Sequence, residues 1–182
     1  MMSNLQDLKD KEELAKKLVD TFDGTVSDAD GTFEMRNTNR VDVAQEDAEK
    51  WLTKKKIPFK SIGFDSKNDR IPSEIWFKLP PFLRCMPDLI VYAKNSVWFL
   101  EVKGCTDNVN FKVEDLQEYS LWNGILPVKV FIYSKQQNKR WIVNLKDIWN
   151  KFDTAEWSRY DDNNKIYLSI PTILFTHEGM ER

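Results

Sequence analysis

The chain has 182 residues, a length that fits one domain with a short appended segment. Hydrophobic residues make up 41% of the sequence and charged residues 31%, which is enough apolar material for a packed core and argues against wholesale disorder. The formal net charge of −2 excludes a generally basic nucleic-acid coat but not a local positive site, because salt screens surface fields beyond about 10 Å.

Cysteine content and hydropathy limit the class of protein further. Cys85 and Cys105 are too few for a four-cysteine zinc or iron–sulfur site. We interpret them as small buried residues, with a redox-sensitive pair as the alternative. No stretch approaches the roughly 20 apolar residues of a membrane span, and the first residues have no apolar signal core. We therefore expect a soluble, cytoplasmic protein without a membrane partner.

The first third of the chain predicts two helices with an irregular segment between them. Residues Leu5 to Phe22 alternate apolar and charged side chains at helical spacing. Thr21 to Asn39 is rich in Asp, Gly, Thr, Ser and Asn, which favours a loop or an irregular strand. A second helix is predicted from Asp42 to about Lys55. Its apolar stripe would consist of Ala44, Ala48, Trp51, Leu52 and Lys55.

The middle of the chain predicts a β-hairpin after a proline-rich stretch. A strand fits Phe59 to Phe64, and a polar loop fits Asp65 to Arg70. Ile71 to Pro87 carries four prolines and resists regular assignment. Two apolar runs, Leu89 to Ala93 and Val97 to Lys103, are rich in strand formers and are joined by turn residues. We expect Gly104 to end the second of these strands.

The elements after the hairpin complete a mixed α/β layer. A helix is predicted from about Val113 to Trp122, and a strand from Val128 to Tyr133. Trp141 to Val143 is a candidate partner strand, and Leu145 to Phe152 a short helix. The order from Asp42 onward is therefore helix, three strands, helix and strand.

Hairpin geometry brings three charged side chains together. If the turn centres on Lys94-Asn95, Asp88 lies opposite Glu101; if it centres one residue later, Asp88 lies opposite Lys103. Both registers put Asp88 on the same sheet face as Glu101 and Lys103, because side chains alternate with period two. A three-residue loop would break this arrangement. Two carboxylates and one ammonium are thus expected at one end of the hairpin.

This group of charges suits phosphodiester hydrolysis. Paired carboxylates bind Mg²⁺ or Mn²⁺, which acidify a water and offset charge on the phosphate. Lys103 could orient that water or stabilise the phosphate oxygens, and the Val102 carbonyl could add another metal ligand. The same pattern also occurs by chance, in hairpins whose strand ends carry ordinary salt-bridging charges.

The sequence from Val41 to about Asp147 resembles the PD-(D/E)xK nuclease superfamily, which includes restriction enzymes, archaeal Holliday-junction resolvases and recombination exonucleases. The resemblance rests on a helix, Pro87-Asp88, the run FLEVKG at Phe99 to Gly104, a second helix and the run VKVFIY. It implies a restriction-endonuclease-like α/β core, with a central mixed β-sheet flanked by helices. That core would occupy residues 40–182, after an N-terminal extension of residues 1–39.

The resemblance also implies roles for individual residues. Asp88 and Glu101 would be metal ligands, and Lys103 the catalytic lysine, with Mg²⁺ or Mn²⁺ as cofactor. The superfamily often adds an acidic residue from the first core helix, for which Gln45 and Glu49 are candidates here. The matching position falls on Gln45, which is neutral, so one and two metal ions both stay open. Glu46 is expected to face solvent.

The helix after Glu-x-Lys often carries a polar residue near the scissile phosphate. A recombination-exonuclease subgroup shows Gln-x-x-x-Tyr there, whereas this chain has Asp115 four residues before Tyr119 and Gln117 out of phase. That subgroup is therefore not supported. The expected nucleic-acid contacts are Arg36, Arg40, Arg84, Lys112, Gln117 and Tyr119. Surface positions without a binding role would explain the arginines and Lys112 equally well.

The function predicted from the sequence is a divalent-metal-dependent nuclease, with DNA as its expected substrate. The alternative is a catalytically inactive nuclease-fold module that binds DNA or a protein partner. The negative net charge and the lack of a clear helix carboxylate favour this alternative, whereas the Asp88, Glu101 and Lys103 set favours the enzyme. Because enzymes that cut both strands are commonly homodimers, a homodimer is a further expectation.

Overall fold

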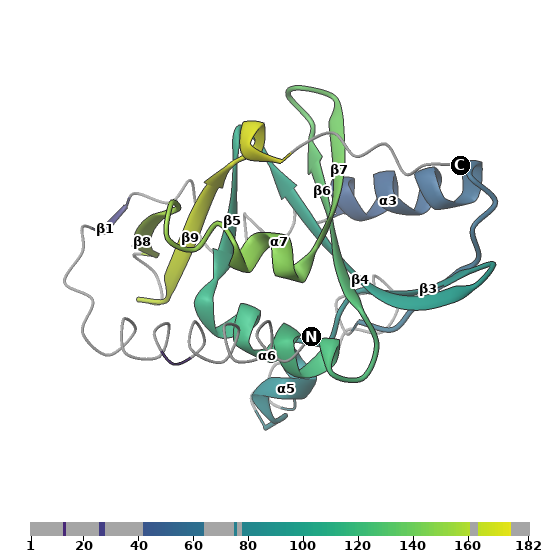
Figure 1. Ribbon diagram of the computed structural model, residues 1–182, viewed down its shortest axis with the longest axis horizontal. Helices are drawn as coiled ribbons and strands as arrows, with labels where there is room; N and C mark the ends of the chain where they lie inside the picture. Colours follow the sequence, from purple (N-terminus) through teal and green to yellow (C-terminus); the bar gives the residue numbers. More distant parts are fainter. Residues whose placement is uncertain are drawn as a thin grey trace.

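A computed structural model of the chain describes residues 13, 26–27, 42–63, 75, 78–160 and 164–175. These residues form a mixed α/β structure with two β-sheets, whose elements are labelled in Figure 1. In chain order the elements are β1 (Val26–Ser27), α3 (Asp42–Lys54), β2 (Phe59–Ser61), α5 (Pro81–Arg84), β3 (Leu89–Ala93), β4 (Ser96–Cys105), β5 (Asn108–Lys112), α6 (Val113–Asn123), β6 (Val128–Ser134), β7 (Lys139–Asn144), α7 (Leu145–Trp149), β8 (Glu156–Tyr160), β9 (Ile166–Pro171) and the 3-10 helix η2 (Thr172–Leu174).

The central sheet has five strands in the order β2-β3-β4-β6-β7. β4 and β6 run parallel, and the other neighbouring pairs run antiparallel. A parallel pair needs a crossover connection, and here β5 and α6 supply it. The predicted α/β fold class, a central mixed sheet flanked by helices, is confirmed.

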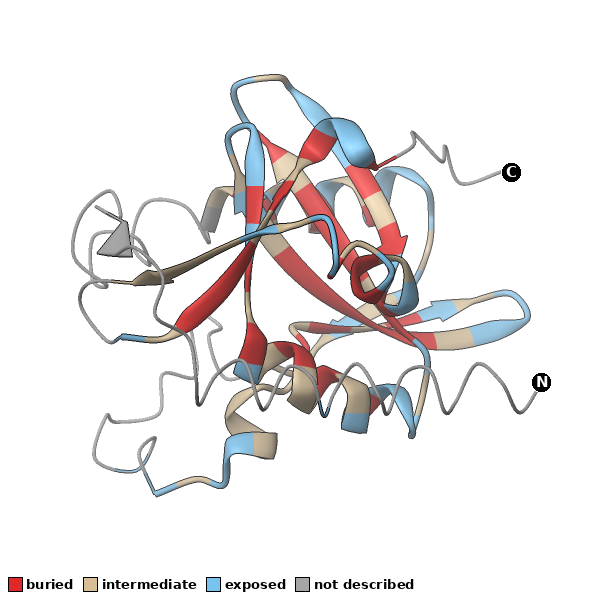
Figure 2. Ribbon diagram, turned by 60° about the vertical axis from the view of Figure 1, so that its left-hand side comes forward, coloured by how far each residue is buried: buried red, intermediate tan, exposed pale blue. Residues whose placement is uncertain are grey.

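Helices cover both faces of this sheet, and β4 is buried between them (Figure 1). Alternate residues of β4 face opposite layers: Leu100 and Val102 pack in the core that contains α3, whereas Phe99 packs in the core that contains α6 and α7. The Glu101 and Lys103 side chains therefore share the sheet face covered by α6. The buried residues in Figure 2 concentrate along these strands and helices.

The apolar side chains predicted to line one face of α3 are the ones through which this helix packs on the central sheet. Ala44, Ala48 and Leu52 are fully buried there, whereas Trp51 is half-buried and Lys55 is exposed. The two alanines leave room for the helix backbone to approach the sheet closely, and Leu52 contributes the larger apolar side chain.

Replacing Leu52 by alanine should lower the free energy of unfolding by about 2–5 kcal/mol, because a fully buried leucine leaves a cavity when it is shortened. Chemical denaturation followed by circular dichroism measures the change. Lys50→Ala on the exposed face of α3 is the matched control and should leave the midpoint unchanged. A midpoint shift as small in Leu52→Ala as in the control would contradict this packing.

The second sheet has the strand order β1-β8-β9-β5 and was not predicted from the sequence. Its strand β5 nevertheless carries a readable signal, because Val109 and Phe111 are buried and alternate with exposed Asn108 and Asn110. β8 lacks this signal, since its burial pattern does not alternate. β1 pairs parallel with β8, so backbone from the expected N-terminal extension joins this sheet.

Several elements differ from the sequence prediction, and β2, expected to run to Phe64, ends at Ser61. Pro81–Arg84 forms the short helix α5 inside the stretch expected to be irregular, since proline is well tolerated in the first turn of a helix. β4 continues through Gly104 to Cys105, because β6 pairs with it over that whole length. α7 ends at Trp149 rather than near Phe152. The expected helix over residues 5–22, apart from residue 13, and the loop over residues 65–70 lie outside the described residues.

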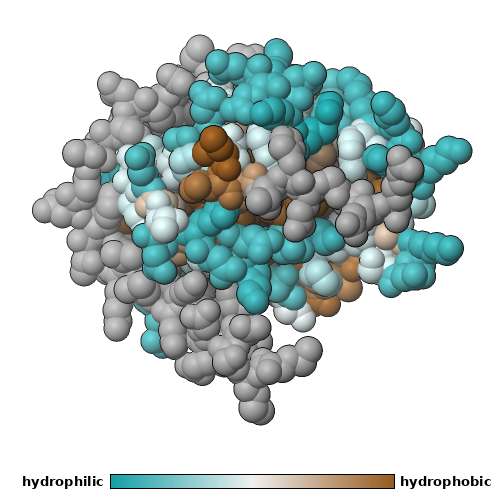
Figure 3. All heavy atoms as spheres, turned by 45° about the horizontal axis from the view of Figure 1, so that its top comes forward, coloured by the Kyte–Doolittle hydropathy of each residue, from teal (hydrophilic) through white to brown (hydrophobic). Residues whose placement is uncertain are grey.

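A small apolar patch is exposed on the surface near the end of the described residues. Ile173 is 89% exposed and Leu174 is 44% exposed, both in η2. Figure 3 brings the side of the molecule that carries η2 forward and shows a hydrophobic patch among mostly hydrophilic residues. In the described part of the chain, every helix is too short or too polar to cross a membrane.

Candidate active site

The β3–β4 hairpin has the first of the two predicted registers. Ala93 pairs with Ser96, so the turn is Lys94-Asn95, and Leu89 pairs with Leu100. The next position along the ladder places Asp88 opposite Glu101. Asp88 and Glu101 thus lie opposite one another just beyond the end of β3, where the sheet stops pairing on that side of β4.

Asp88 is anchored by backbone contacts on both of its sides. Its carbonyl accepts hydrogen bonds from the amides of Ile62 (2.9 Å) and Gly63 (3.1 Å). Its carboxylate oxygen Oδ2 accepts a hydrogen bond of 2.7 Å from the amide of Val102. A Cβ at position 63 would lie 3.0 Å from the Asp88 Cα, so glycine permits this close approach. These contacts hold the Asp88 carboxylate beside the middle of the Glu-x-Lys segment.

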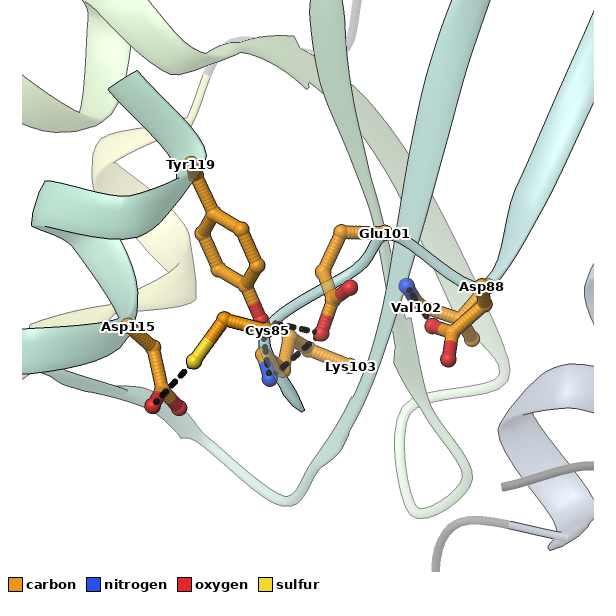
Figure 4. A network of polar contacts seen from close by, with 7 residues as sticks. All are labelled: Cys85, Asp88, Glu101, Val102, Lys103, Asp115 and Tyr119. Atoms are coloured by element: carbon orange, nitrogen blue, oxygen red, sulfur yellow. Dashed lines mark hydrogen bonds and ion pairs between the residues drawn. The ribbon is translucent and has the colours of Figure 1, made fainter. Parts of the chain in front are cut away.

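Glu101, Lys103 and Tyr119 form a closed triangle of polar contacts (Figure 4). The Tyr119 hydroxyl donates to Glu101 Oε1 at 2.6 Å. Lys103 Nζ lies 2.6 Å from the same oxygen and donates to the Tyr119 hydroxyl at 3.2 Å. Glu101 is only 5% exposed, and a carboxylate so deeply buried is tolerated because it is both paired and hydrogen-bonded.

The charges around this triangle keep Lys103 and Tyr119 protonated. Burial by itself lowers the pKa of Lys103, but the negative charges of Glu101, Asp115 and Asp88 and the hydrogen bond to Glu101 raise it above its usual value overall. The pKa of Tyr119 is raised by burial first and then by the same three carboxylates. Lys103 is therefore an ammonium, and Tyr119 a neutral donor, throughout the physiological range.

Carboxylate and carbonyl oxygens, the ligand types that a hard divalent cation takes, are present at this position. Mg²⁺ is commonly held by one or two carboxylates and keeps several waters, so Asp88 and Glu101 suffice in number. The amide of Val102 points to Asp88, and in an extended strand the carbonyl of the same residue leaves on the same side. In the part of the chain that the structure describes, no three acidic, histidine or cysteine side chains gather as a complete metal cage.

The structure does not gather the α3 candidates with this group. Gln45 Nε2 donates to Glu49 Oε1 at 3.2 Å, one turn apart on a half-buried flank of the helix. α3 packs on the sheet face that carries Leu100 and Val102, opposite the face of Glu101. Glu46 is exposed beside Lys50, as expected.

The expected nucleic-acid contacts separate into buried, half-buried and undescribed positions. Tyr119 is 3% exposed, and its hydroxyl is taken by Glu101 and Lys103, so it lies inside the site rather than on a binding surface. Lys112, at the end of β5, and Gln117 on α6 are half-buried. Arg36 and Arg40 lie outside the described residues.

Arg84 is the last residue of α5, which packs against α6. Burial and the negative charge of Asp115 raise the pKa of the Glu118 carboxyl, and the positive charge of Arg84 partly offsets this rise. Phe82 of α5 stacks on Trp122 of α6 with ring centroids 4.3 Å apart. Three half-buried side chains each have a buried polar atom without a hydrogen-bond partner, namely Arg84 Nε, Gln117 Nε2 and Glu118 Oε2. α5 thus packs on the same helix that supplies Tyr119.

Both cysteines are free thiols in separate environments. Cys85 Sγ donates to Asp115 Oδ1 at 3.6 Å, and burial together with Asp115 raises the pKa of this thiol to about 12. Burial and Asp107 raise the pKa of Cys105 to about 12 as well. Both side chains were expected to be buried; the structure has them half-buried, packed against the apolar core.

Both thiols should react about 10³-fold more slowly than an exposed cysteine at pH 8, because a pKa near 12 leaves almost no thiolate. Timed labelling of the native chain, with the unfolded chain as reference, measures the rates. Asp115→Asn should speed the labelling of Cys85 and leave Cys105 unchanged. Rapid labelling of both thiols in the native wild-type chain would contradict the burial described here.

Comparison with known proteins leaves the chain without an assigned family. No family model and no curated protein matches it. Among solved structures, D212, a nuclease from a fusselovirus, is similar at a TM-score of 0.43 and 12% sequence identity, over 82% of this chain and 90% of that chain. A similarity this distant supports no conclusion about activity.

Sequence reasoning missed the position of Tyr119 relative to the charged trio. A signal was present, because Val113, Leu116, Tyr119 and Trp122 recur at helical spacing and are all buried. A tyrosine on the buried face of the helix that follows Glu-x-Lys faces the strand, so its hydroxyl needs a polar partner there.

Proposed function

We propose that this chain is a divalent-metal-dependent nuclease of the PD-(D/E)xK type that hydrolyses phosphodiester bonds in DNA. The supporting observation is that Asp88 lies opposite Glu101 at the open end of the hairpin, where Glu101 contacts Lys103. Lys103 Nζ lies 2.6 Å from Glu101 Oε1, and the Asp88 charge acts on the same ammonium. An ordinary surface salt bridge has no need of a buried carboxylate or a buried tyrosine partner.

Each residue of the site has a distinct task in this proposal. Asp88, Glu101 and the Val102 carbonyl would hold Mg²⁺ or Mn²⁺, which supplies an acidified water and positive charge against the phosphate. Lys103 would bring its ammonium to the attacking water or to the nonbridging phosphate oxygens. Tyr119 would orient Glu101 through its hydroxyl. A homodimer would agree with cleavage of both strands.

Cleavage assays on differently structured nucleic acids test the proposal. Purified full-length chain is incubated with Mg²⁺ or Mn²⁺ and with linear duplex, circular duplex, single-stranded and branched DNA, and with RNA. We expect metal-dependent cleavage of at least one DNA that a chelator stops and that Lys103→Ala abolishes without loss of fold. The catalytic proposal fails if every substrate remains intact with either metal.

One observation favours a second candidate, a nuclease-fold module that binds DNA or a protein without cutting. Within the described residues the two carboxylates gain no third acidic, histidine or cysteine partner, which would leave much of the coordination to water and substrate. Titration calorimetry with Mn²⁺ separates the two candidates. No heat of binding, together with retained DNA binding, would favour the module.

A further inference from the structure

Lys103 occupies the charge position beside Glu101 that a divalent cation would need. Lys103 Nζ and the Tyr119 hydroxyl both contact the same oxygen of Glu101, Oε1, at 2.6 Å. A carboxylate that is almost fully buried needs a counter-charge to remain ionised. The Lys103 ammonium, in direct contact with this carboxylate, supplies that charge.

The lysine has a route away from this contact and the carboxylate does not. The Lys103 side chain keeps 24% of its surface exposed, compared with 7% for the Glu101 side chain. A lysine stem has four rotatable carbons, so its ammonium can leave Glu101 without movement of the strand. Glu101, in contrast, is held by the Tyr119 hydroxyl and by its place in β4, where it pairs with Val130 of β6.

Two cations compete when they need the same buried carboxylate. The positive charges of an ammonium and a divalent ion would repel one another strongly at these separations, since the partly desolvated site screens them less than bulk water does. We propose that Lys103 is an internal counter-ion that competes with the divalent metal for Glu101 and leaves that carboxylate when the metal binds. This inference rests on the proposed function, because it takes Asp88 and Glu101 as the metal ligands.

The competition has a consequence that a purely catalytic lysine would not produce. Removing the ammonium should abolish cleavage and at the same time strengthen metal binding. The lysine would thus set a lower limit on the metal concentration at which the site fills. Reciprocally, bound metal should free the Lys103 ammonium, because coupling between two ligands of one site acts equally in both directions.

Mn²⁺ titration calorimetry on the full-length chain tests this competition. Lys103→Met keeps the length of the side chain and removes its charge, and should bind Mn²⁺ about tenfold more tightly than the wild type. Lys94→Met, in the exposed turn of the same hairpin, is the matched control and should bind like the wild type. Adding Asp88→Asn to Lys103→Met should remove the gain if the metal binds at this site.

The outcomes separate this inference from the proposed function. Equal or weaker binding by Lys103→Met, with measurable binding by the wild type, overturns the competition and leaves the nuclease proposal standing. No binding by the wild type or either lysine variant overturns the metal site itself and the inference with it. Near-ultraviolet circular dichroism checks the fold of each variant.

A second measurement uses the wild-type chain and so remains decisive if Lys103→Met fails to fold. Acetylation of lysines is followed by mass spectrometry with and without Mn²⁺. Lys103 should be labelled faster with Mn²⁺, while Lys94 labels at the same rate in both conditions. A Lys103 rate that stays constant or falls at saturating Mn²⁺ would overturn the competition.

Discussion

Replacing Asp88 by asparagine is expected to lower the cleavage rate at least about 10²–10³-fold while the fold is retained. The Asp88 carboxylate accepts a hydrogen bond from the Val102 amide, and the asparagine side-chain oxygen can accept that bond as well. The substitution therefore removes the negative charge and keeps the contact that positions the residue. Initial cleavage rates with Mn²⁺, together with thermal unfolding, measure the two effects separately.

Asp107→Asn is the matched control for this substitution. Asp107 follows the C-terminal end of β4, and its carboxylate accepts a hydrogen bond of 2.8 Å from Gln137 Nε2. The control thus removes one carboxylate charge from a hydrogen-bonded position outside the candidate site, and cleavage should be unchanged. Similar loss of activity in both variants would mean that Asp88 acts through general surface charge rather than at the reacting phosphate.

Tyr119→Phe should weaken both the fold and the site. The hydroxyl donates to Glu101 at 2.6 Å inside the core, and its loss leaves a buried carboxylate oxygen with one partner fewer. We expect a loss of about 1–3 kcal/mol in the free energy of unfolding. Because Tyr119 orients a proposed metal ligand, a loss of about 10–100-fold in Mn²⁺ affinity or cleavage rate should accompany it.

Tyr92→Phe controls for removal of a tyrosine hydroxyl. Tyr92 lies on β3 of the same hairpin and is 42% exposed, so solvent satisfies its hydroxyl. Denaturation midpoints and Mn²⁺ affinities of the two variants are compared with those of the wild type. If Tyr119→Phe is as stable and binds Mn²⁺ as tightly as Tyr92→Phe, the hydrogen bond from Tyr119 to Glu101 contributes neither to stability nor to metal binding.

The hairpin at the centre of these experiments was predictable because its signals are local. Leu89–Ala93 and the residues after Asn95 are rich in β-branched and aromatic side chains, and two turn residues separate them. Side-chain alternation then placed Glu101 and Lys103 on one face without knowledge of any other element. The helix at Asp42–Lys54 was similarly readable, since its small and apolar residues recur at helical spacing.

The second sheet was less readable because its strands depend on partners distant in sequence. β5 pairs with β9, about 60 residues later in the sequence. β8 has no fully buried face, so its sequence carries no alternating pattern that would predict a strand. α5 was hidden by its prolines, which argue against helix in general but allow a first turn. In each case the stabilising contact comes from a segment that a local reading does not include.

Residue types and spacing along the chain were enough to predict the charged trio, the strands that carry it and the order of the elements around them. The tertiary structure alone placed Tyr119 on Glu101, directed Asp88 to the Val102 amide and set α3 on the opposite face from Glu101. The physical reason is that periodicity defines which face of an element a side chain occupies. The partner on that face depends on how separate elements pack.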